Sequence, residues 1–368
     1  MCYLVLFFLF RNMKTKLLTS SFFLLLIVGY FAYSESGVPG FEFKGEKMKG
    51  LSFVAPNKPI DKNHVKAINR VHADWASLMP YGFIKKGEAT FRFSKGADVS
   101  EHGHQWWGEQ PNGIIKCIEL AHEEGKKVML KPHMWYGRGM YTGDFKLNSE
   151  KEWKEFERTF GAYILQYAKI AKEHQVELFC IATEMKTMVA ERPDFWFKLI
   201  KEIRTLYKGQ LTYAENWDCF DDVPFWAELD YVGIDGYFPL SKERSPELAD
   251  LKKGWAKHLK KMNQVSSKNQ KAILFTEYGF RSCDYSTEKP WQIDYSLPDN
   301  EGLQARAYQS LFEEVWKQPW FAGGFVWKWF PFKEPEKESR DKFCPQHKEA
   351  EEILTQFYGK TSSSVKQL

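Results

Sequence analysis

The stretch Lys271-Ala-Ile-Leu-Phe-Thr-Glu-Tyr-Gly-Phe280 decides the fold. Its apolar run from Ala272 to Phe275 follows a polar segment and is soon followed by Gly279, so it predicts a short strand that is buried on both faces. Strands of this kind are typical of parallel sheets, and Glu277 then stands at the carboxyl end of the strand. Barrels and open α/β sheets place their chemistry at these ends.

A second stretch repeats this pattern. Val176-Glu-Leu-Phe-Cys-Ile-Ala-Thr-Glu184 is another apolar run that ends in Thr-Glu. Because parallel strands bring their carboxyl ends to one rim, Glu184 and Glu277 are expected to face the same pocket. Two carboxyl groups are what the hydrolysis of a glycosidic bond requires, since one protonates the leaving oxygen and the other attacks or activates water.

The alternation of strands and helices predicts a closed barrel. From residue 48 onward, apolar runs alternate with amphipathic helical stretches, and eight strands are expected, at 50–54, 75–79, 127–131, 176–184, 210–217, 229–235, 272–277 and 323–327. Eight such units favour a closed parallel barrel over an open sheet. We therefore expect one α/β domain, a single (β/α)8 TIM barrel, over residues 48–360, with a linker at 35–47 and a flexible tail at 361–368.

The first residues are typical of a targeting segment. Lys14 and Lys16 precede an apolar run that extends to Tyr33, which predicts a signal peptide over residues 1–34 or, as the alternative, an uncleaved N-terminal anchor. The true start is expected at Met13, because the residues before it are themselves apolar. Both interpretations predict export to the periplasm, the cell surface or the medium, with membrane contact only through an uncleaved N-terminal segment.

Charge and cysteine content exclude several classes of protein. The chain has 52 basic and 48 acidic residues, a net charge of +4, so no basic surface for nucleic acid is expected. The motifs include no serine elbow, no phosphate-binding glycine loop and no metal-ligand cluster, so we expect no cofactor and no metal. We also expect a monomer. The cysteines form no disulfide framework, although Cys219 and Cys283 could pair in an exported protein.

The residues that follow the predicted strands are the pocket candidates, because all strand exits share one rim. Carboxylates and aromatic rings dominate them, and sugar rings stack their apolar faces on indole and phenol groups. The predicted substrate-binding residues are His133, Trp135, Asn216, Trp217, Asp235, Tyr237, Tyr278, Trp291 and Trp327.

Several of these residues have alternative interpretations. Asp235 and Glu215 compete with the glutamate pair as catalysts, but Asp235 could instead hold a basic neighbour and Glu215 could point outward. His133 could bind a sugar hydroxyl, orient a glutamate or belong to the core. Either Tyr237 or Tyr278 is expected to hydrogen-bond Glu277 and keep it ionised.

Four short motifs carry a family resemblance. They are Lys131-Pro-His133, Ile181-Ala-Thr-Glu-Met185, Phe275-Thr-Glu-Tyr-Gly279 and Gly324-Phe-Val-Trp327. Together they resemble the retaining (β/α)8 glycosidases with catalytic glutamates on strands four and seven, and more closely glycoside hydrolase family 113, whose members are β-mannanases. The resemblance spans residues 48–358 and implies Glu184 as general acid/base and Glu277 as nucleophile. Many members of the superfamily carry asparagine before the acid/base, where this chain has Thr183.

The resemblance implies a retaining hydrolase that cleaves β-1,4-mannosidic bonds in mannan or manno-oligosaccharides by double displacement. In such an enzyme the two carboxyl groups lie about 5–5.5 Å apart. Two alternatives stay open. One of them arises because a catalytic pair does not encode the sugar. The chain could be a β-glycosidase of the same superfamily with another sugar specificity, or a carbohydrate-binding barrel without turnover.

Overall fold

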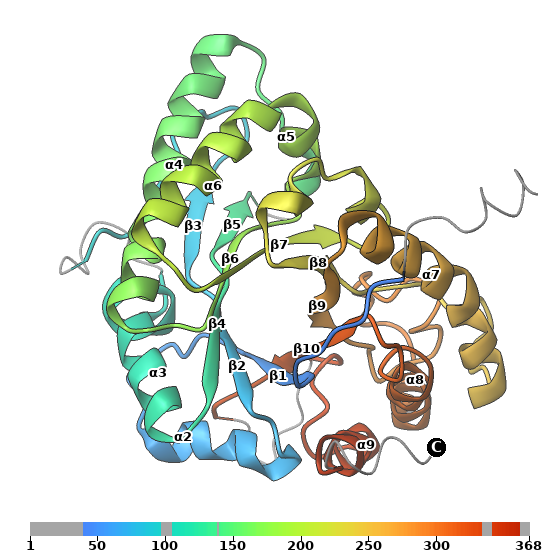
Figure 1. Cartoon of the computed structure of the whole chain (residues 1–368). Helices are drawn as coiled ribbons and strands as arrows, with labels where there is room; N and C mark the ends of the chain where they lie inside the picture. Colours follow the sequence, from blue (N-terminus) through green and yellow to red (C-terminus); the bar gives the residue numbers. More distant parts are fainter. Residues whose placement is uncertain (1–39, 97–104, 138–139, 333–340, 361–368) are drawn as a thin grey trace, which may run out of the picture. The chain divides into compact units, whose positions relative to one another are not determined.

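The computed structural model describes residues 40–96, 105–137, 140–332 and 341–360. Eight parallel strands close into a barrel in the order β1-β10-β9-β8-β7-β6-β4-β2 (Figure 1). This arrangement confirms the predicted single (β/α)8 barrel. The barrel strands are β1 (Met48–Phe53), β2 (Trp75–Leu78), β4 (Lys127–Leu130), β6 (Leu178–Thr183), β7 (Gln210–Asn216), β8 (Tyr231–Asp235), β9 (Ala272–Tyr278) and β10 (Phe321–Trp329).

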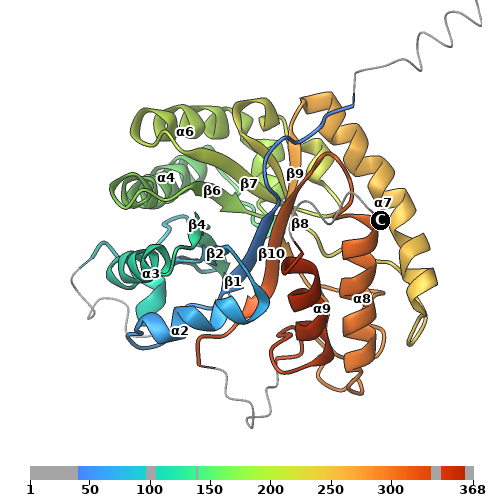
Figure 2. The same ribbon diagram turned by 60° about the horizontal axis from the view of Figure 1, so that its bottom comes forward.

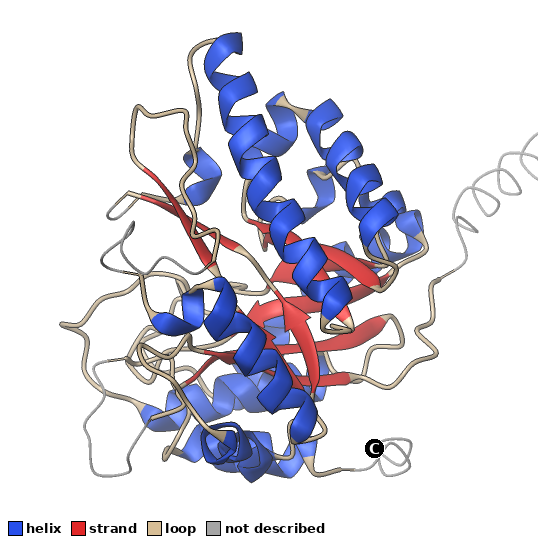
Figure 3. Cartoon of the chain, turned by 90° about the vertical axis from the view of Figure 1, so that its left-hand side faces the viewer, coloured by secondary structure: helices blue, strands red, loops and turns tan. Residues whose placement is uncertain are grey.

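The helices surround the strands, as Figure 3 shows. Ser149 begins the longest of them by accepting a hydrogen bond from the Glu152 amide, and Asn300 accepts one from Leu303 at the start of α8. Helices α8 and α9 pack side by side next to β10 (Figure 2). The helices are α2 (Lys62–Lys66), α3 (Pro111–Glu123), α4 (Glu150–Glu173), α5 (Lys186–Glu191), α6 (Pro193–Leu206), α7 (Leu248–Asn269), α8 (Glu301–Glu314) and α9 (Glu349–Tyr358).

The core has two parts because successive side chains of a strand point to opposite faces. One cluster fills the barrel interior, with Leu178, Cys180, Ala214 and Leu274 among its members. The other lies between the strands and the helices. This outer cluster includes four tryptophans that are at most 9% exposed, Trp153, Trp196, Trp255 and Trp316.

Two further strands extend the barrel wall above its rim. β3 (Tyr81–Ile84) and β5 (His133–Tyr136) pair in parallel, in the same register as β2 and β4 below them. Pro80 and Pro132 interrupt the ladder because proline has no N–H to donate, but the His133 amide still donates to the Pro80 carbonyl. The sequence predicted loops here. The extension instead places His133 and Trp135 on a paired strand above the rim.

Several expectations concern the termini and the cysteines. The predicted leader at 1–34, with the proposed start at Met13, and the tail at 361–368 lie outside the described residues. Among the residues that are described, no helix combines the length and apolar character needed to cross a membrane. No disulfide links the cysteines there, so the suggested bond between Cys219 and Cys283 is absent from this structure.

Candidate active site

A bulge at the end of β9 turns Glu277 toward the barrel axis. Along β8 and β9 the register steps from Ile234 opposite Phe275 to Asp235 opposite Glu277, so β9 contains one extra residue. Phe275 and Tyr278 both lie in the outer core, three positions apart. Thr276 and Glu277 between them therefore both face inward. Strict alternation would have pointed Glu277 at the helices.

An unusual backbone conformation ends β6 and holds Glu184 at the rim. The Glu184 backbone is left-handed, with φ of 51°, and its N–H donates to the Ala214 carbonyl over 2.7 Å. A left-handed residue other than glycine costs about 1–2 kcal/mol, and such strain clusters at functional sites. The register between β6 and β7 also shifts just before this point, after Cys180. Glu184 keeps partial exposure to solvent.

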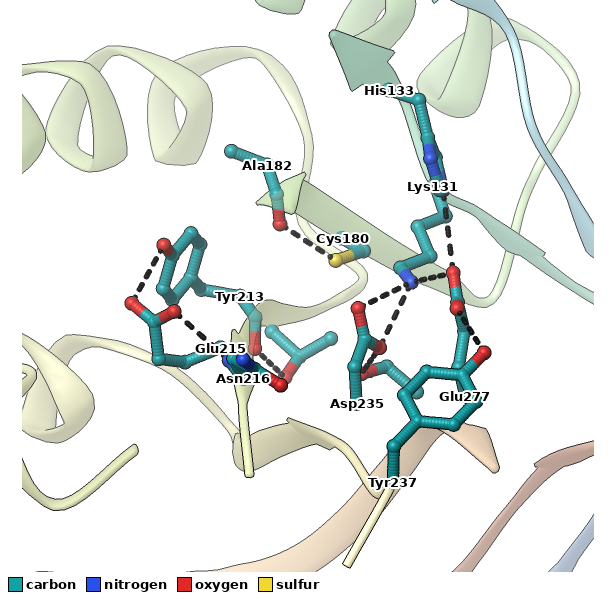
Figure 4. Close-up of polar contacts among 12 residues, drawn as sticks. Lys131, His133, Cys180, Ala182, Tyr213, Glu215, Asn216, Asp235, Tyr237 and Glu277 are labelled. Atoms are coloured by element: carbon teal, nitrogen blue, oxygen red, sulfur yellow. Dashed lines mark hydrogen bonds and ion pairs between the residues drawn. The ribbon is translucent and has the colours of Figure 1, made fainter. Parts of the chain in front are cut away.

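A buried lysine connects two carboxylates below the rim (Figure 4). Lys131 is fully buried at the end of β4, and its Nζ donates to both oxygens of Asp235, at 3.0 and 3.2 Å, and to Glu277 Oε1 at 2.5 Å. The Thr276 hydroxyl donates to Asp235 Oδ1 over 2.7 Å, and the Tyr237 hydroxyl donates to Glu277 Oε2 over 2.7 Å. Both oxygens of Glu277 therefore have donors.

The two glutamates differ in what surrounds them. Burial raises the pKa of Glu184 well above its usual range, and the nearby carboxyl groups of Asp235 and Glu277 raise it further. Burial and Asp235 also raise the pKa of Glu277, but Lys131 and the Tyr237 hydroxyl oppose that rise by stabilising the anion. Among the described residues no side chain hydrogen-bonds the Glu184 carboxyl. On balance the pKa of Glu277 rises to about 7, less than the rise at Glu184, so the arrangement favours the proton on Glu184 and the negative charge on Glu277.

His133 lies next to Glu277 as a neutral imidazole. Burial, and then the charge of Lys131, holds the pKa of His133 well below its usual range. Its Nε2 is 3.6 Å from Glu277 Oε1, too far for a hydrogen bond. The ring lies 5.1 Å from Tyr81 and is nearly parallel to that of Trp327, with 16° between the planes. The roles suggested for His133, contact with sugar or orientation of the glutamate, stay predictions.

Three buried polar atoms near the glutamates have no hydrogen-bond partner among the described residues. They are His133 Nε2, Thr183 Oγ1 and the Tyr141 hydroxyl. Burial and the proximity of Glu184 raise the pKa of Tyr141, so its phenol stays protonated. An unsatisfied buried polar group costs about 1–3 kcal/mol, and a hydroxyl-rich ligand would relieve this cost. Tyr141 was not predicted, because it lies in an irregular loop after β5 without a recognisable pattern.

Indole rings surround the site. Trp217 directly follows β7 and stacks on Trp291, with 5.2 Å between ring centroids and 24° between the planes. Trp291 is 44% exposed and Trp135 on β5 is 50% exposed, so both offer ring surface to solvent. Asn216 and Trp327 are half-buried at the ends of their strands. Exposed indole faces of this kind suit a sugar chain.

Comparison with known proteins decides the family. A sequence model of Glycoside Hydrolase Family 113 matches residues 62–348. The chain belongs to this family. It is therefore a glycoside hydrolase, and the resemblance seen in the sequence motifs is confirmed. No curated protein matches this family-113 chain.

Solved structures of family 113 share the fold. The GH113 β-mannanase AaManA from Alicyclobacillus acidocaldarius aligns with a TM-score of 0.74 and 23% identity over 88% of this chain and 99% of its own. A GH113 β-1,4-mannanase aligns with a TM-score of 0.72 and 24% identity over 86% of this chain and 100% of its own. A β-glucuronidase from Ruminococcus gnavus aligns with a TM-score of 0.61 and 11% identity, over 88% of this chain and 53% of its own.

The structure corrects two predicted substrate contacts of this hydrolase. Tyr278 is fully buried, and its hydroxyl is 2.7 Å from that of Tyr358 in the outer core, so the tyrosine that binds Glu277 is Tyr237. Asp235 is also fully buried, which leaves its carboxylate no open face for sugar. The alternative suggested for Asp235, that it holds a basic neighbour, is confirmed by its ion pair with Lys131.

Glu215 is not part of the pocket. It points away from the barrel axis, as suggested, but it is 1% exposed instead of facing solvent. Its carboxylate accepts hydrogen bonds from the Tyr213 hydroxyl over 3.0 Å and from the Asn216 amide over 2.9 Å. Its part is to support the end of β7.

Lys131 was missed as a site residue, although a signal was present. A lysine at the end of an otherwise apolar strand must pair with an acid when the strand is buried.

Among the described residues no group of His, Cys, Asp and Glu is arranged to hold a metal ion. A cavity of about 700 Å³ between α4 and α6 contains none of the candidate residues.

Proposed function

We propose that this family-113 hydrolase is an exported, retaining β-mannanase that cleaves β-1,4-mannosidic bonds. The observation that carries the proposal is the unequal glutamate pair, with Glu277 held by two donors and Glu184 held by none among the described side chains. Solved family members with the same fold are named β-mannanases, which supports mannan as the substrate class.

In the first step Glu277 acts as the nucleophile. One of its carboxylate oxygens forms a bond with the anomeric carbon while the bond from that carbon to the leaving oxygen breaks. Glu184 transfers its proton to the leaving oxygen, which departs as a sugar hydroxyl. The raised pKa of Glu184 keeps this proton available near neutral pH.

In the second step Glu184, now ionised, acts as the base. It removes a proton from water, and the water oxygen attacks the anomeric carbon as the ester bond to Glu277 breaks. The Glu277 carboxylate is released next to Lys131 and Tyr237, which stabilise the returning charge. Two inversions leave the anomeric configuration unchanged.

The rim provides binding groups for a glycan chain. We assign sugar stacking to the exposed faces of Trp135 and Trp291, with Trp217 supporting Trp291 from behind. Asn216, His133 and Trp327 line the same rim and are assigned to the sugar nearest the glutamates. The unsatisfied polar atoms of His133, Thr183 and Tyr141 are suited to sugar hydroxyls.

The experiment that tests the function is turnover of a substrate panel. β-Mannan, glucomannan, cellulose, xylan and β-galactan are incubated with the wild type, with Glu277→Ala and with Glu184→Gln, and released sugars are sized. We expect short oligosaccharides from mannan, reduced by at least about a thousandfold in both variants, since each removes a group that acts in the transition state. NMR of the first product should show retained configuration.

Other outcomes of the panel decide between the alternatives. Turnover of another glycan alone would keep the glycosidase and reject the mannanase. The Ruminococcus gnavus β-glucuronidase structures illustrate that this fold accommodates other sugars. Glycan binding without turnover would favour a carbohydrate-binding barrel.

Export rests on the N-terminal sequence alone. Lys14, Lys16 and the following apolar run are typical of a leader that is removed or retained as an anchor. Expression in a secreting host, followed by fractionation and N-terminal sequencing, tests this part. Recovery of the intact chain in the cytoplasm would reject it.

A further inference from the structure

The roles proposed for Glu184 and Glu277 leave one feature of the site unexplained, the buried ammonium group of Lys131. Lys131 is fully buried, and its Nζ contacts Asp235 and Glu277 at once (Figure 4). An ion pair alone needs one acid, and Asp235 already has its partners in Lys131 and Thr276. The additional contact with Glu277 connects the lysine to the proposed reaction.

We propose that Lys131 is a positioning residue that assigns the single proton of this site to Glu184, because it holds Asp235 and Glu277 together as anions. The proposal rests on the proposed function for the roles of the two glutamates. It goes beyond that function by naming the residue that gives the two glutamates different protonation states.

The sum of charges through the reaction supports this role. In the free enzyme Lys131 is positive, Asp235 and Glu277 are negative and Glu184 is neutral, so the sum is −1. In the covalent intermediate Glu277 is an uncharged ester and Glu184 has lost its proton, so the sum is again −1. Without the lysine the sum of charges is −2 in both states. Because these groups are buried, a sum of −2 favours protonation of Glu277, and a protonated Glu277 cannot act as the nucleophile.

Other groups that face the cluster do not provide a second cation. His133 is held neutral next to Lys131, and the remaining groups are acids. Besides Asp235 and Glu277, the titratable groups around Lys131 are Tyr81 on β3, His133 on β5, Cys180 on β6, Glu184 directly after β6 and Tyr237 after β8. Among the described residues that surround Asp235 and Glu277, Lys131 therefore provides the only positive charge.

The test is the pH profile of kcat/KM on the best substrate of the panel. Removal of the positive charge in Lys131→Met should raise the pKa of both glutamates and move both limbs of the profile to higher pH by at least about 1 unit, with a loss of activity of a hundredfold or more at the optimum. Lys131→Arg should restore the position of the limbs. Asp235→Asn removes a negative charge and should move them to lower pH.

Controls separate this role from a structural one. Lys47→Met removes another partly buried lysine, which contacts the Trp316 and Gln318 carbonyls, and should leave the limbs in place. Lower activity of Lys131→Met with unshifted limbs would overturn the proposal, as would a shift of Asp235→Asn in the same direction as Lys131→Met. If Lys131→Met does not fold, the other two variants still test the proposal, because Lys131→Arg should keep the limbs at their wild-type position and Asp235→Asn should move them to lower pH.

A second measurement does not depend on turnover. The titration of Glu277, followed by NMR of 13C-labelled glutamate and assigned by the signal lost in Glu277→Gln, should shift upward in Lys131→Met and downward in Asp235→Asn. An unchanged titration would overturn the role of Lys131 even for an active enzyme. A wild type that turns over no glycoside of the panel would instead reject the proposed function.

Discussion

At the scale of single residues, the site depends on which donors reach which carboxylate oxygen. Tyr237 and Tyr278 are similar in sequence context, since each follows an acidic strand end, yet only Tyr237 reaches Glu277. Tyr278 points the other way, to Tyr358. Burial raises the pKa of both tyrosines well above the usual range, so each hydroxyl remains a donor at any working pH.

This pair of tyrosines allows a matched test. Tyr237→Phe removes a hydrogen bond to an ionised carboxylate, worth about 1.5–3 kcal/mol, so kcat/KM should fall about 10- to 100-fold. The phenol favours the anion of Glu277, so its loss raises that pKa and moves the acid limb of the pH profile to higher pH.

Tyr278→Phe is the control for that variant. It breaks a buried hydrogen bond in the outer core, so the melting temperature should fall while the acid limb stays in place. Acid limbs that move equally in both variants, or in neither, would contradict the assignment of Tyr237 to Glu277.

At the scale of elements, β1 and β10 close the barrel through a contact that needs glycine. Gly323 has φ of +104° and lies opposite Met48, and a Cβ built there would come within 2.3 Å of the Met48 carbonyl oxygen. Both the conformation and the space exclude other residues. The same strand ends in the Trp327 region of the rim, so closure at its start also places residues of the site.

Gly323→Ala is expected to destabilise the barrel by more than about 2 kcal/mol, since strain and a backbone clash add. Gly125→Ala is the comparison. That residue ends α3 with φ of +69° and has open space around its Cβ position, so only the strain of about 1 kcal/mol applies. Urea unfolding of both variants measures the difference, and equal midpoints would show that the clash relaxes without cost.

At the scale of the whole molecule, the segment before β1 covers the floor of the barrel. Phe41 and Phe43 pack against the interior cluster, and the Phe43 amide donates to the Pro319 carbonyl over 2.9 Å. Lys47 donates to the Gln318 carbonyl over 2.7 Å. Part of the predicted linker at 35–47 is therefore structural.

Two truncations measure this contribution. A chain that starts at Phe41 keeps these contacts, whereas one that starts at Met48 loses them and exposes apolar surface at the barrel floor. We expect the shorter chain to be less stable by about 2 kcal/mol, the burial of roughly one large apolar side chain. The same midpoint in thermal unfolding for both chains would show that residues 41–47 add no stability.

Local patterns predicted much of this molecule. Apolar runs and amphipathic stretches depend on nearby residues, so they indicated the eight strands, the barrel and the exits where Glu184 and Glu277 lie. The indoles of Trp135 and Trp291 were found for the same reason, because a strand exit or a long loop brings them to the rim.

What only the tertiary structure decided is the direction of side chains at those exits. The bulge in β9, the left-handed backbone at Glu184 and the extension of β2 and β4 past Pro80 and Pro132 depend on hydrogen bonds to neighbouring strands. Those neighbours lie far away in the sequence, so no local pattern records them. The sequence alone determined the barrel and its acidic rim, because both depend on local patterns. Contacts between residues far apart in the sequence decided that Tyr237, and not Tyr278, binds Glu277 and that Lys131 lies beneath Glu277.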